Sequence, residues 1–169
     1  HNLARLALLA NEPEAAETMY REALQQKVAR YGNDHPEVAL THNSLGLLYE
    51  TRGEPERALA SFDTALSMQR DRPLDAAVTR YNIGRIAGAR RGEEELARAL
   101  ESFVTILGDH PQTVSCALAL GETKLAAGDV QAADAFRRAM AHATDAAERE
   151  RAEAGLARAL AAAADPAPP

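Results

Sequence analysis

Apolar residues recur every three or four positions along most of the chain, and no segment alternates with a period of two. Short breaks that contain Gly, Asn, Asp or Pro interrupt this pattern at regular places. The pattern predicts a chain of helices joined by tight turns, over about residues 1–10, 13–30, 37–51, 55–70, 74–90, 93–107, 111–126, 129–142 and 146–163.

The breaks are of two kinds. The first kind precedes a residue expected to open a helix, and comprises Ala10-Asn11 before Pro13, Arg52-Gly53 before Pro55, Arg91-Gly92 before Glu93 and Ala127-Gly128 before Asp129. The second kind has an acid that can cap a helix and then a proline in its first turn, as in Asp34-His35-Pro36, Asp71-Arg72-Pro73 and Asp109-His110-Pro111. Gly32 and Gly108 stand before two of these breaks, where we expect a left-handed helix end.

Successive helix pairs repeat the same residue types at the same places. The first helix of a pair carries Gly or Ala, and the second carries Ala and, four residues later, an aromatic residue. That aromatic position holds Tyr20, Phe62, Phe103 and Phe136. We expect the small residues to let two helices approach closely, and the aromatic ring to fill the gap between successive pairs.

This pattern, Leu45-Gly46-x-x-Tyr49 followed by Ala58-x-x-x-Phe62, resembles the tetratricopeptide repeat. Residues 31–50, which contain a Gly-x-Asp-His-Pro linker, resemble more narrowly the 42-residue repeat of kinesin light chains and their bacterial relatives, and 42 residues also separate Pro13 from Pro55. The resemblance implies an all-α, right-handed solenoid of antiparallel helix pairs over 1–163. Its repeats would cover about 1–32, 33–70, 71–108 and 109–142, with a capping helix at 145–163 and a disordered tail at 164–169.

In such arrays the first helix of each pair lines the inner, concave wall. In the resembling family, asparagines on this wall pair with the main chain of an extended peptide, and arginine can hold a carboxylate with two hydrogen bonds. By position, the candidate peptide-binding residues here are Asn2, Arg5, Asn43, Leu47, Glu50, Tyr81, Asn82 and Arg85. Ser115 and Glu122 face the same way, but the fourth repeat has Leu118-Ala119 where the family has Asn, which puts its ligand binding in doubt. The alternative is that these side chains merely line a solvated groove.

The composition of the chain argues against some classes of binding partner. The net charge is −6 and only Lys27 and Lys124 are lysines, which argues against nucleic acid, and no apolar run is long enough for a membrane span. Cys116 is the single cysteine, and we expect it to be a buried apolar residue. We expect a cytoplasmic protein, and because the chain begins at His1 in mid-pattern, we expect it to be a piece of a longer bacterial one.

Signals of catalysis are weak. No nucleophile-elbow or phosphate-binding motif occurs, and His35 and His110 are explained by the turns that contain them. We therefore expect no metal, no cofactor and no enzyme, but a scaffold that binds a protein or peptide in its concave groove. Two alternatives stay open: a regulatory arm of a larger signalling protein such as a Ser/Thr kinase, protease or transcription regulator, and a self-association module that forms a homo-oligomer.

Overall fold

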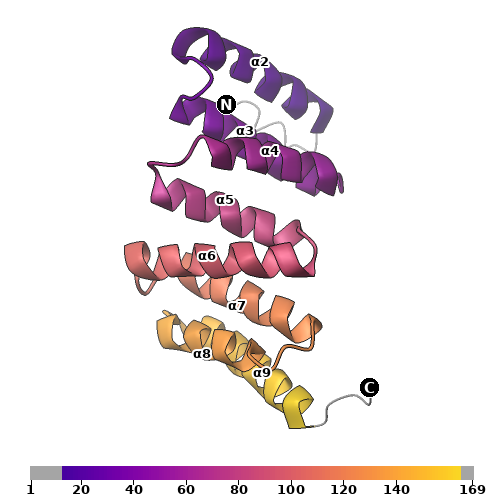
Figure 1. The fold of residues 1–169 in the computed structure, drawn as a ribbon, viewed down its shortest axis with the longest axis vertical. Helices are drawn as coiled ribbons and strands as arrows, with labels where there is room; N and C mark the ends of the chain where they lie inside the picture. The colour runs from indigo at the N-terminus through magenta and orange to yellow at the C-terminus, as the bar shows by residue number, and fades with distance from the viewer. Residues whose placement is uncertain (1–12, 165–169) are drawn as a thin grey trace. The chain divides into compact units, whose positions relative to one another are not determined.

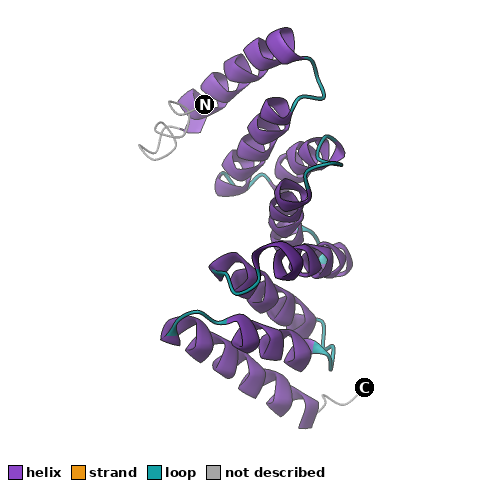
Figure 2. Cartoon of the chain, turned by 90° about the vertical axis from the view of Figure 1, so that its left-hand side faces the viewer, coloured by secondary structure: helices purple, strands orange, loops and turns teal. Residues whose placement is uncertain are grey.

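A computed structural model describes residues 13–164 of the chain. Over this range the protein is helical, with loops between the helices and no strand (Figure 2). The all-α prediction is therefore confirmed. The candidates Asn2 and Arg5, the first predicted helix and residues 165–169 of the predicted tail lie outside the described residues, whereas Ala164 is helical.

The chain divides between Ile86 and Ala87 into two compact units. The described helices of unit 1 are α2 (Pro13–Tyr31), α3 (Pro36–Thr51), α4 (Pro55–Ser67) and α5 (Pro73–Ile86). Those of unit 2 are α6 (Ala89–Leu107), α7 (Pro111–Ala126), α8 (Ala132–His142) and α9 (Ala146–Ala164). Within each unit, consecutive helices lie side by side, α3 also touches α5, and α7 also touches α9 (Figure 1).

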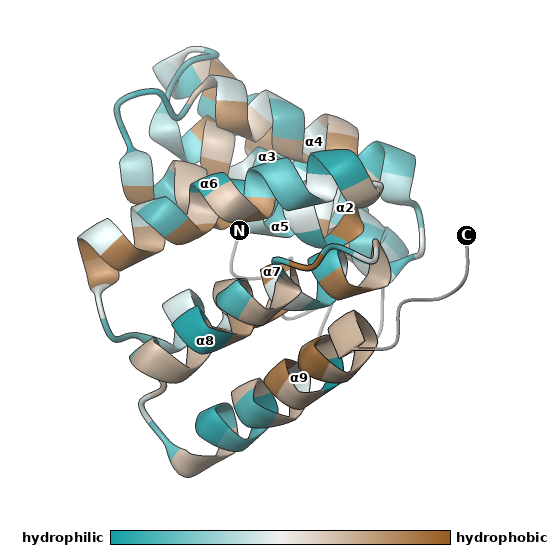
Figure 3. Cartoon of the chain, turned by 60° about the horizontal axis from the view of Figure 1, so that its bottom comes forward, coloured by the Kyte–Doolittle hydropathy of each residue, from teal (hydrophilic) through white to brown (hydrophobic). Residues whose placement is uncertain are grey.

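The cores follow the predicted aromatic positions. Phe62, Phe103 and Phe136 are at most 1% exposed, and Tyr20 is also buried. The helices carry both hydrophobic and hydrophilic stretches (Figure 3), as helices that bury one face require. The prediction that these four aromatic residues are packed between helices is therefore in line with their burial.

Glycine lies directly against these rings. A Cβ at Gly46 of α3 would stand 2.5 Å from the ring of Phe62, which is closer than carbon atoms approach. Phe136 of α8 is enclosed from two sides, because a Cβ would stand 2.8 Å from its ring at Gly121 of α7 and 2.3 Å at Gly155 of α9. Phe136 thus fills the gap to the following helix, as predicted. The contact that excludes a Cβ at these glycines is with the phenylalanine ring, and not with the alanine of the second helix as the sequence suggested.

The helix starts correct one detail of the prediction. His35 and His110, not the preceding acids, cap α3 and α7: their Nδ1 atoms accept from the backbone N–H of Glu37 at 3.2 Å and of Gln112 at 3.1 Å. Asp109 pairs instead with His142 of α8 at 2.8 Å. Gly32 and Gly108 have the positive φ expected of them, 85° and 60°, but the ψ of −127° at Gly108 is not that of a left-handed helical residue.

Some helix ends also differ from the prediction. The break between α5 and α6 falls at Ala87-Gly88, where Gly88 is the extended N-cap, and Gly92 lies buried inside α6. Helix α4 ends at Ser67 rather than 70, since Gln69 N–H bonds to Leu66 O at 3.1 Å in a tighter turn. Helix α8 begins at Ala132 rather than 129.

Candidate interaction surface

The candidate residues that the structure describes gather where α3 and α5 meet. Asn43, Leu47 and Glu50 come from α3, and Tyr81, Asn82 and Arg85 come from α5. Asn43, Leu47 and Glu50 follow one another at about one turn along α3, and Arg85 lies about one turn after the adjacent pair Tyr81 and Asn82 on α5. The two sets lie in unit 1, and side-chain bonds join them across the α3–α5 contact.

The two asparagines bond to each other. Asn82 Nδ2 donates to Asn43 Oδ1 across 3.3 Å, and Thr79 Oγ1 donates to the same oxygen across 3.3 Å. Two donors on Oδ1 orient the Asn43 carboxamide and turn its Nδ2 group away from them. Asn82 is 6% exposed and Asn43 is half-buried, so Asn43 is the more accessible of the two asparagines.

The remaining polar candidates also pair. Arg85 of α5 forms a short ion pair with Glu50 of α3, and its guanidinium lies 5.5 Å from the centre of the Tyr81 ring. Arg85 is exposed and Glu50 is half-buried, so this pair is open to solvent and contributes little to stability. A carboxylate from a ligand would have to share Arg85 with Glu50.

Two leucines interrupt this polar surface. Leu40 is 46% exposed and Leu47 is 37% exposed, and they flank Asn43 on α3 at the spacing of one helical face. Large apolar side chains with this exposure, placed beside oriented hydrogen-bond donors, are typical of surfaces that bind a partner. We call the side chains of Leu40, Asn43, Leu47, Glu50, Tyr81 and Arg85 the α3–α5 face.

A cavity of about 160 Å³ opens beside this face, between the N-terminal halves of α3 and α5. Of the residues that line it, Asn43 alone was a predicted binding residue. The others are Pro36, Glu37, Ala39, Leu40, Gln69, Arg72, Asp75, Val78 and Thr79. Gln69 and Arg72 belong to the turn between α4 and α5. The Asp71-Arg72-Pro73 pattern marks this turn in the sequence, but only the folded chain shows that the turn borders the face.

Unit 2 offers a different surface at its α7–α9 contact. Glu122 of α7 pairs with Arg158 of α9, with Arg158 Nη1 3.2 Å from Glu122 Oε2. The neighbouring cavity, of about 410 Å³, is lined by Leu118, Glu122, Arg151, Ala154 and Arg158. It contains no carboxamide side chain.

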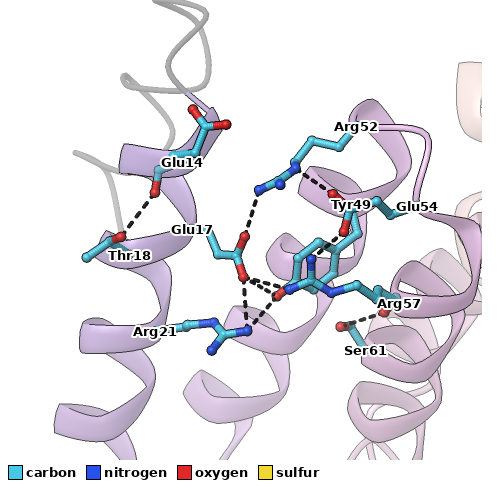
Figure 4. Close-up of polar contacts among 9 residues, drawn as sticks. All are labelled: Glu14, Glu17, Thr18, Arg21, Tyr49, Arg52, Glu54, Arg57 and Ser61. Carbon is cyan, nitrogen blue, oxygen red and sulfur yellow. Dashed lines mark hydrogen bonds and ion pairs between the residues drawn. The ribbon is translucent and has the colours of Figure 1, made fainter.

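A network of charges ties α2 to α3 and α4 (Figure 4). Glu17 of α2 accepts from Tyr49 Oη at 3.0 Å, from Arg52 at 2.7 Å and from Arg57 at 2.7 Å. The Arg57 guanidinium also lies 3.9 Å from the centre of the Tyr49 ring. Burial opposes the ionisation of Glu17, but the hydrogen bonds from Arg57 and Tyr49 outweigh it, so the pKa of Glu17 is lowered. These groups satisfy one another, and we assign them a structural role.

Other titratable groups in the described residues are structural as well. Burial raises the pKa of the Cys116 thiol to about 12, and the thiol donates to Leu96 O at 3.4 Å, so the prediction of a buried apolar residue is confirmed. Burial lowers the pKa of His42, which is half-buried in α3. Residues 13–164 contain no group of three metal-ligating side chains. No helix in this range has the length and apolar character to cross a membrane.

Comparison with known proteins finds likenesses in sequence and in fold. Residues 1–71 match the family model of the tetratricopeptide repeat. The biofilm formation methyltransferase WspC of Pseudomonas putida is 33% identical over 100 residues, which make up 57% of this chain and 22% of that relative. The chain thus covers about a fifth of the length of this curated relative.

Solved structures extend the likeness beyond residue 71. A kinesin light chain of Podosopora anserina with nearly identical TPR-like repeats is 18% identical, covering 97% of this chain and 85% of its own, with a TM-score of 0.83. BtubC (BKLC) from P. vanneervenii is 23% identical, covering 99% of this chain and 81% of its own, with a TM-score of 0.75. The predicted solenoid fold is confirmed by these likenesses. The family likeness is thus to the tetratricopeptide repeat over residues 1–71, and the fold over nearly the whole length is that of the kinesin-light-chain repeat structures.

Proposed function

We propose that the protein is a non-catalytic interaction scaffold of the bacterial cytoplasm, which binds an extended peptide or a segment of a partner protein along the α3–α5 face. The repeat fold supports the general role, since repeat arrays present continuous surfaces to other macromolecules. The observation that carries the specific site is Asn43: Asn82 and Thr79 hold the Oδ1 atom of its carboxamide, and it stands on α3 between two exposed leucines.

The face has the composition that an extended peptide needs. The Asn43 donors can bond to a main-chain carbonyl whatever the ligand sequence, while Leu40 and Leu47 can cover apolar side chains on either side of it. Tyr81 and Arg85 add an aromatic surface and a cation farther along. Asn82 supports Asn43 instead of reaching the ligand, because it is buried. Asn2 and Arg5 remain predicted contributors from the N-terminal helix.

A charge at Leu47 tests this site. Leu47→Glu should cost little stability, because the side chain is exposed, but it should abolish binding of peptides selected from a random displayed library on the purified parent protein. Leu160→Glu is the matched control, since Leu160 is a 49% exposed leucine on α9 in unit 2. If Leu47→Glu binds the selected peptides as well as the parent does, the α3–α5 face is not the binding site.

A second candidate function is that of an arm of a larger signalling protein, and the likeness to WspC favours it. That relative is named as a methyltransferase and is far longer than the matched segment. If this candidate function is correct, the scaffold would bring a partner to an active domain elsewhere in the parent protein. The complete coding sequence would test it, because an uninterrupted reading frame with no further domain would contradict this candidate.

Self-association is a weaker candidate. Copies would pair through the same faces that otherwise bind a partner. Light scattering of the purified protein at several concentrations distinguishes the two, since a scaffold that binds only other proteins should keep the mass of one chain.

A further inference from the structure

Gln69 is a buried side chain whose hydrogen-bonding capacity is unused. It is 5% exposed, and its Oε1 has no hydrogen-bond partner among the described residues. A buried acceptor without a partner destabilises a fold, so such groups usually have a structural or functional reason. Gln69 lines the cavity between α3 and α5, and the terminal torsion of glutamine is soft enough to turn either end of its carboxamide toward that space.

Asn43 supplies the opposite capacity on the same cavity. Its Oδ1 is occupied by Asn82 and Thr79, which leaves the two Nδ2 hydrogens for a ligand. The cavity therefore offers a donor group whose orientation is fixed and a second carboxamide that both donates and accepts. Ala39, Leu40 and Val78 provide apolar wall around them.

The charged residues of the lining are already neutralised. Glu37 pairs with Lys27 at 2.8 Å, and the hydrogen bond from Lys27 lowers the pKa of Glu37, so this pair stays ionised. Arg72 forms a short ion pair with Asp75. A charged ligand group would find no free counter-charge among these four residues, whereas a neutral polar group would not need one.

We propose that this cavity, lined by Ala39, Leu40, Asn43, Gln69 and Val78 and here called the carboxamide pocket, receives the side-chain carboxamide of a glutamine or asparagine in the bound peptide. A ligand carboxamide accepts from Asn43 Nδ2 through its oxygen and donates to Gln69 Oε1 through its nitrogen. Both unused groups of the pocket are then satisfied at once. This inference rests on the proposed function, because it assumes that a peptide lies along the α3–α5 face.

Other occupants fit the same groups less well. A carboxylate has no hydrogen to donate to Gln69 Oε1, and even if Gln69 turns its Nε2 group toward the ligand, the charge finds no free counter-charge in the lining. An ammonium has no acceptor for Asn43 Nδ2. An aliphatic side chain would leave both carboxamides unpaired in a desolvated pocket. A site built to bond a particular polar group discriminates strongly against analogues that lack it, so the pocket should distinguish glutamine from glutamate, leucine and methionine of similar size.

The test is a positional-scanning library of acetylated, amidated hexapeptides, screened for binding to the purified full chain. We expect one position at which glutamine or asparagine binds at least about tenfold more tightly than glutamate, leucine or methionine. A preference there for an aromatic, aliphatic or charged residue would overturn the inference and leave the proposed function standing. Binding by no member of the library would overturn both.

Variants of the residues that line the carboxamide pocket test whether this pocket causes the preference for glutamine or asparagine. Gln69→Leu should remove the preference at that one position, leave the other positions unchanged, and keep or raise the Tm, because an unpaired buried acceptor is replaced by carbon. Asn43→Asp keeps an oxygen that accepts from Asn82 and Thr79 but loses the two Nδ2 hydrogens. It should therefore also lose the preference for glutamine or asparagine. Gln26→Leu, at an exposed glutamine of α2, is the matched control and should behave as the parent does. Retention of the preference by Gln69→Leu would contradict the inference.

Discussion

Units 1 and 2 use different side chains for the same structural task. Tyr49 stands three residues after Gly46 in α3, and Lys124 stands three residues after Gly121 in α7. Tyr49 Oη donates to Glu17 of the preceding helix at 3.0 Å, and Lys124 Nζ lies 2.8 Å from Glu93 of the helix before its own. In both repeats this position holds a long side chain whose apolar stem is buried and whose polar tip reaches an acid on the preceding helix, whether the tip is a phenol or an ammonium.

The surfaces of the two units differ more than their cores. The α3–α5 contact carries a bonded asparagine pair and a pocket with unused carboxamide groups, whereas the α7–α9 contact carries the Glu122–Arg158 pair. Close packing limits what core positions can hold, but groove positions are free to vary with the ligand. This comparison concentrates the proposed binding in unit 1.

The chain provides separate probes for the two units. Its four tyrosines, Tyr20, Tyr31, Tyr49 and Tyr81, lie in unit 1, and it has no tryptophan. Its single cysteine, Cys116, is buried in unit 2. Tyrosine fluorescence therefore reports unfolding of unit 1, and the reactivity of the thiol reports opening of unit 2.

The largest expected effect is that of Phe136→Ala. Truncating a buried phenylalanine should lower the free energy of unfolding by about 3 to 5 kcal/mol, and we expect the upper end because this ring packs on Gly121 and Gly155 together. Urea titration followed by Cys116 reactivity measures it. Phe62→Ala, followed by tyrosine fluorescence, is the counterpart in unit 1. A loss below about 1 kcal/mol in either variant would contradict the repeat register that both rings define.

The next largest effects are the losses in the free energy of unfolding caused by Lys124→Met and by Tyr49→Phe, which should differ in size. Lys124→Met leaves Glu93 and Asp129 beside each other without their common cation, so we expect a loss of about 3 kcal/mol. Tyr49→Phe removes one hydrogen bond to Glu17 and keeps the ring, so we expect about 1 to 2 kcal/mol.

A high salt concentration should affect the losses caused by these two variants differently. The loss caused by Lys124→Met should shrink at about 1 M NaCl, where the Debye length is about 3 Å, because both acids are partly exposed. The loss caused by Tyr49→Phe should change less, since the phenol is neutral. Equal salt sensitivity in the two variants would contradict the assignment of the Lys124 contribution to charge attraction and of the Tyr49 contribution to a hydrogen bond from a neutral group.

The positions of the helices and of the buried rings could be predicted from sequence, because they depend on a local period and on packing that each repeat renews. Phe62, Phe136, Gly32 and Gly108 all behave as expected for this reason. The start of α6 could not be predicted, because Gly88 and Gly92 are equally good breakers in sequence. Packing decides between them by burying Gly92 in the helix.

The candidate site was predictable only in part. Sequence placed Asn43 and Asn82 on facing helices, but it could not show that one carboxamide is used up in orienting the other. Gln69 carries no signal at all, since it lies in a turn whose approach to α3 depends on the tertiary fold. Hydrogen bonds between side chains from separate repeats are set by ångström-scale geometry, and a repeat pattern does not contain that information.

The smallest expected effect is acid destabilisation through Glu17. The folded chain lowers the pKa of this carboxyl below 4.5, so its contribution to stability is present above that pH and is lost as the pH falls through the folded pKa. Asp129 of unit 2 is lowered from 3.8 by its hydrogen bond from Lys124, so the loss there begins at a lower pH. We therefore expect tyrosine fluorescence to report weakening of unit 1 from about pH 4.5 downward, before Cys116 reports it for unit 2.

Glu17→Gln isolates the contribution of this residue. The variant cannot ionise, so it should lose about 1 kcal/mol at pH 7, where its arginine partners are partly exposed and screened, and should show a shallower fall of unit 1 stability below pH 4.5. Glu22→Gln, at an exposed acid of the same helix, should keep the slope of the parent. If Glu17→Gln also keeps that slope, the acid sensitivity of unit 1 originates in another carboxyl, of which Glu37 is the first to substitute because its pKa is lowered too.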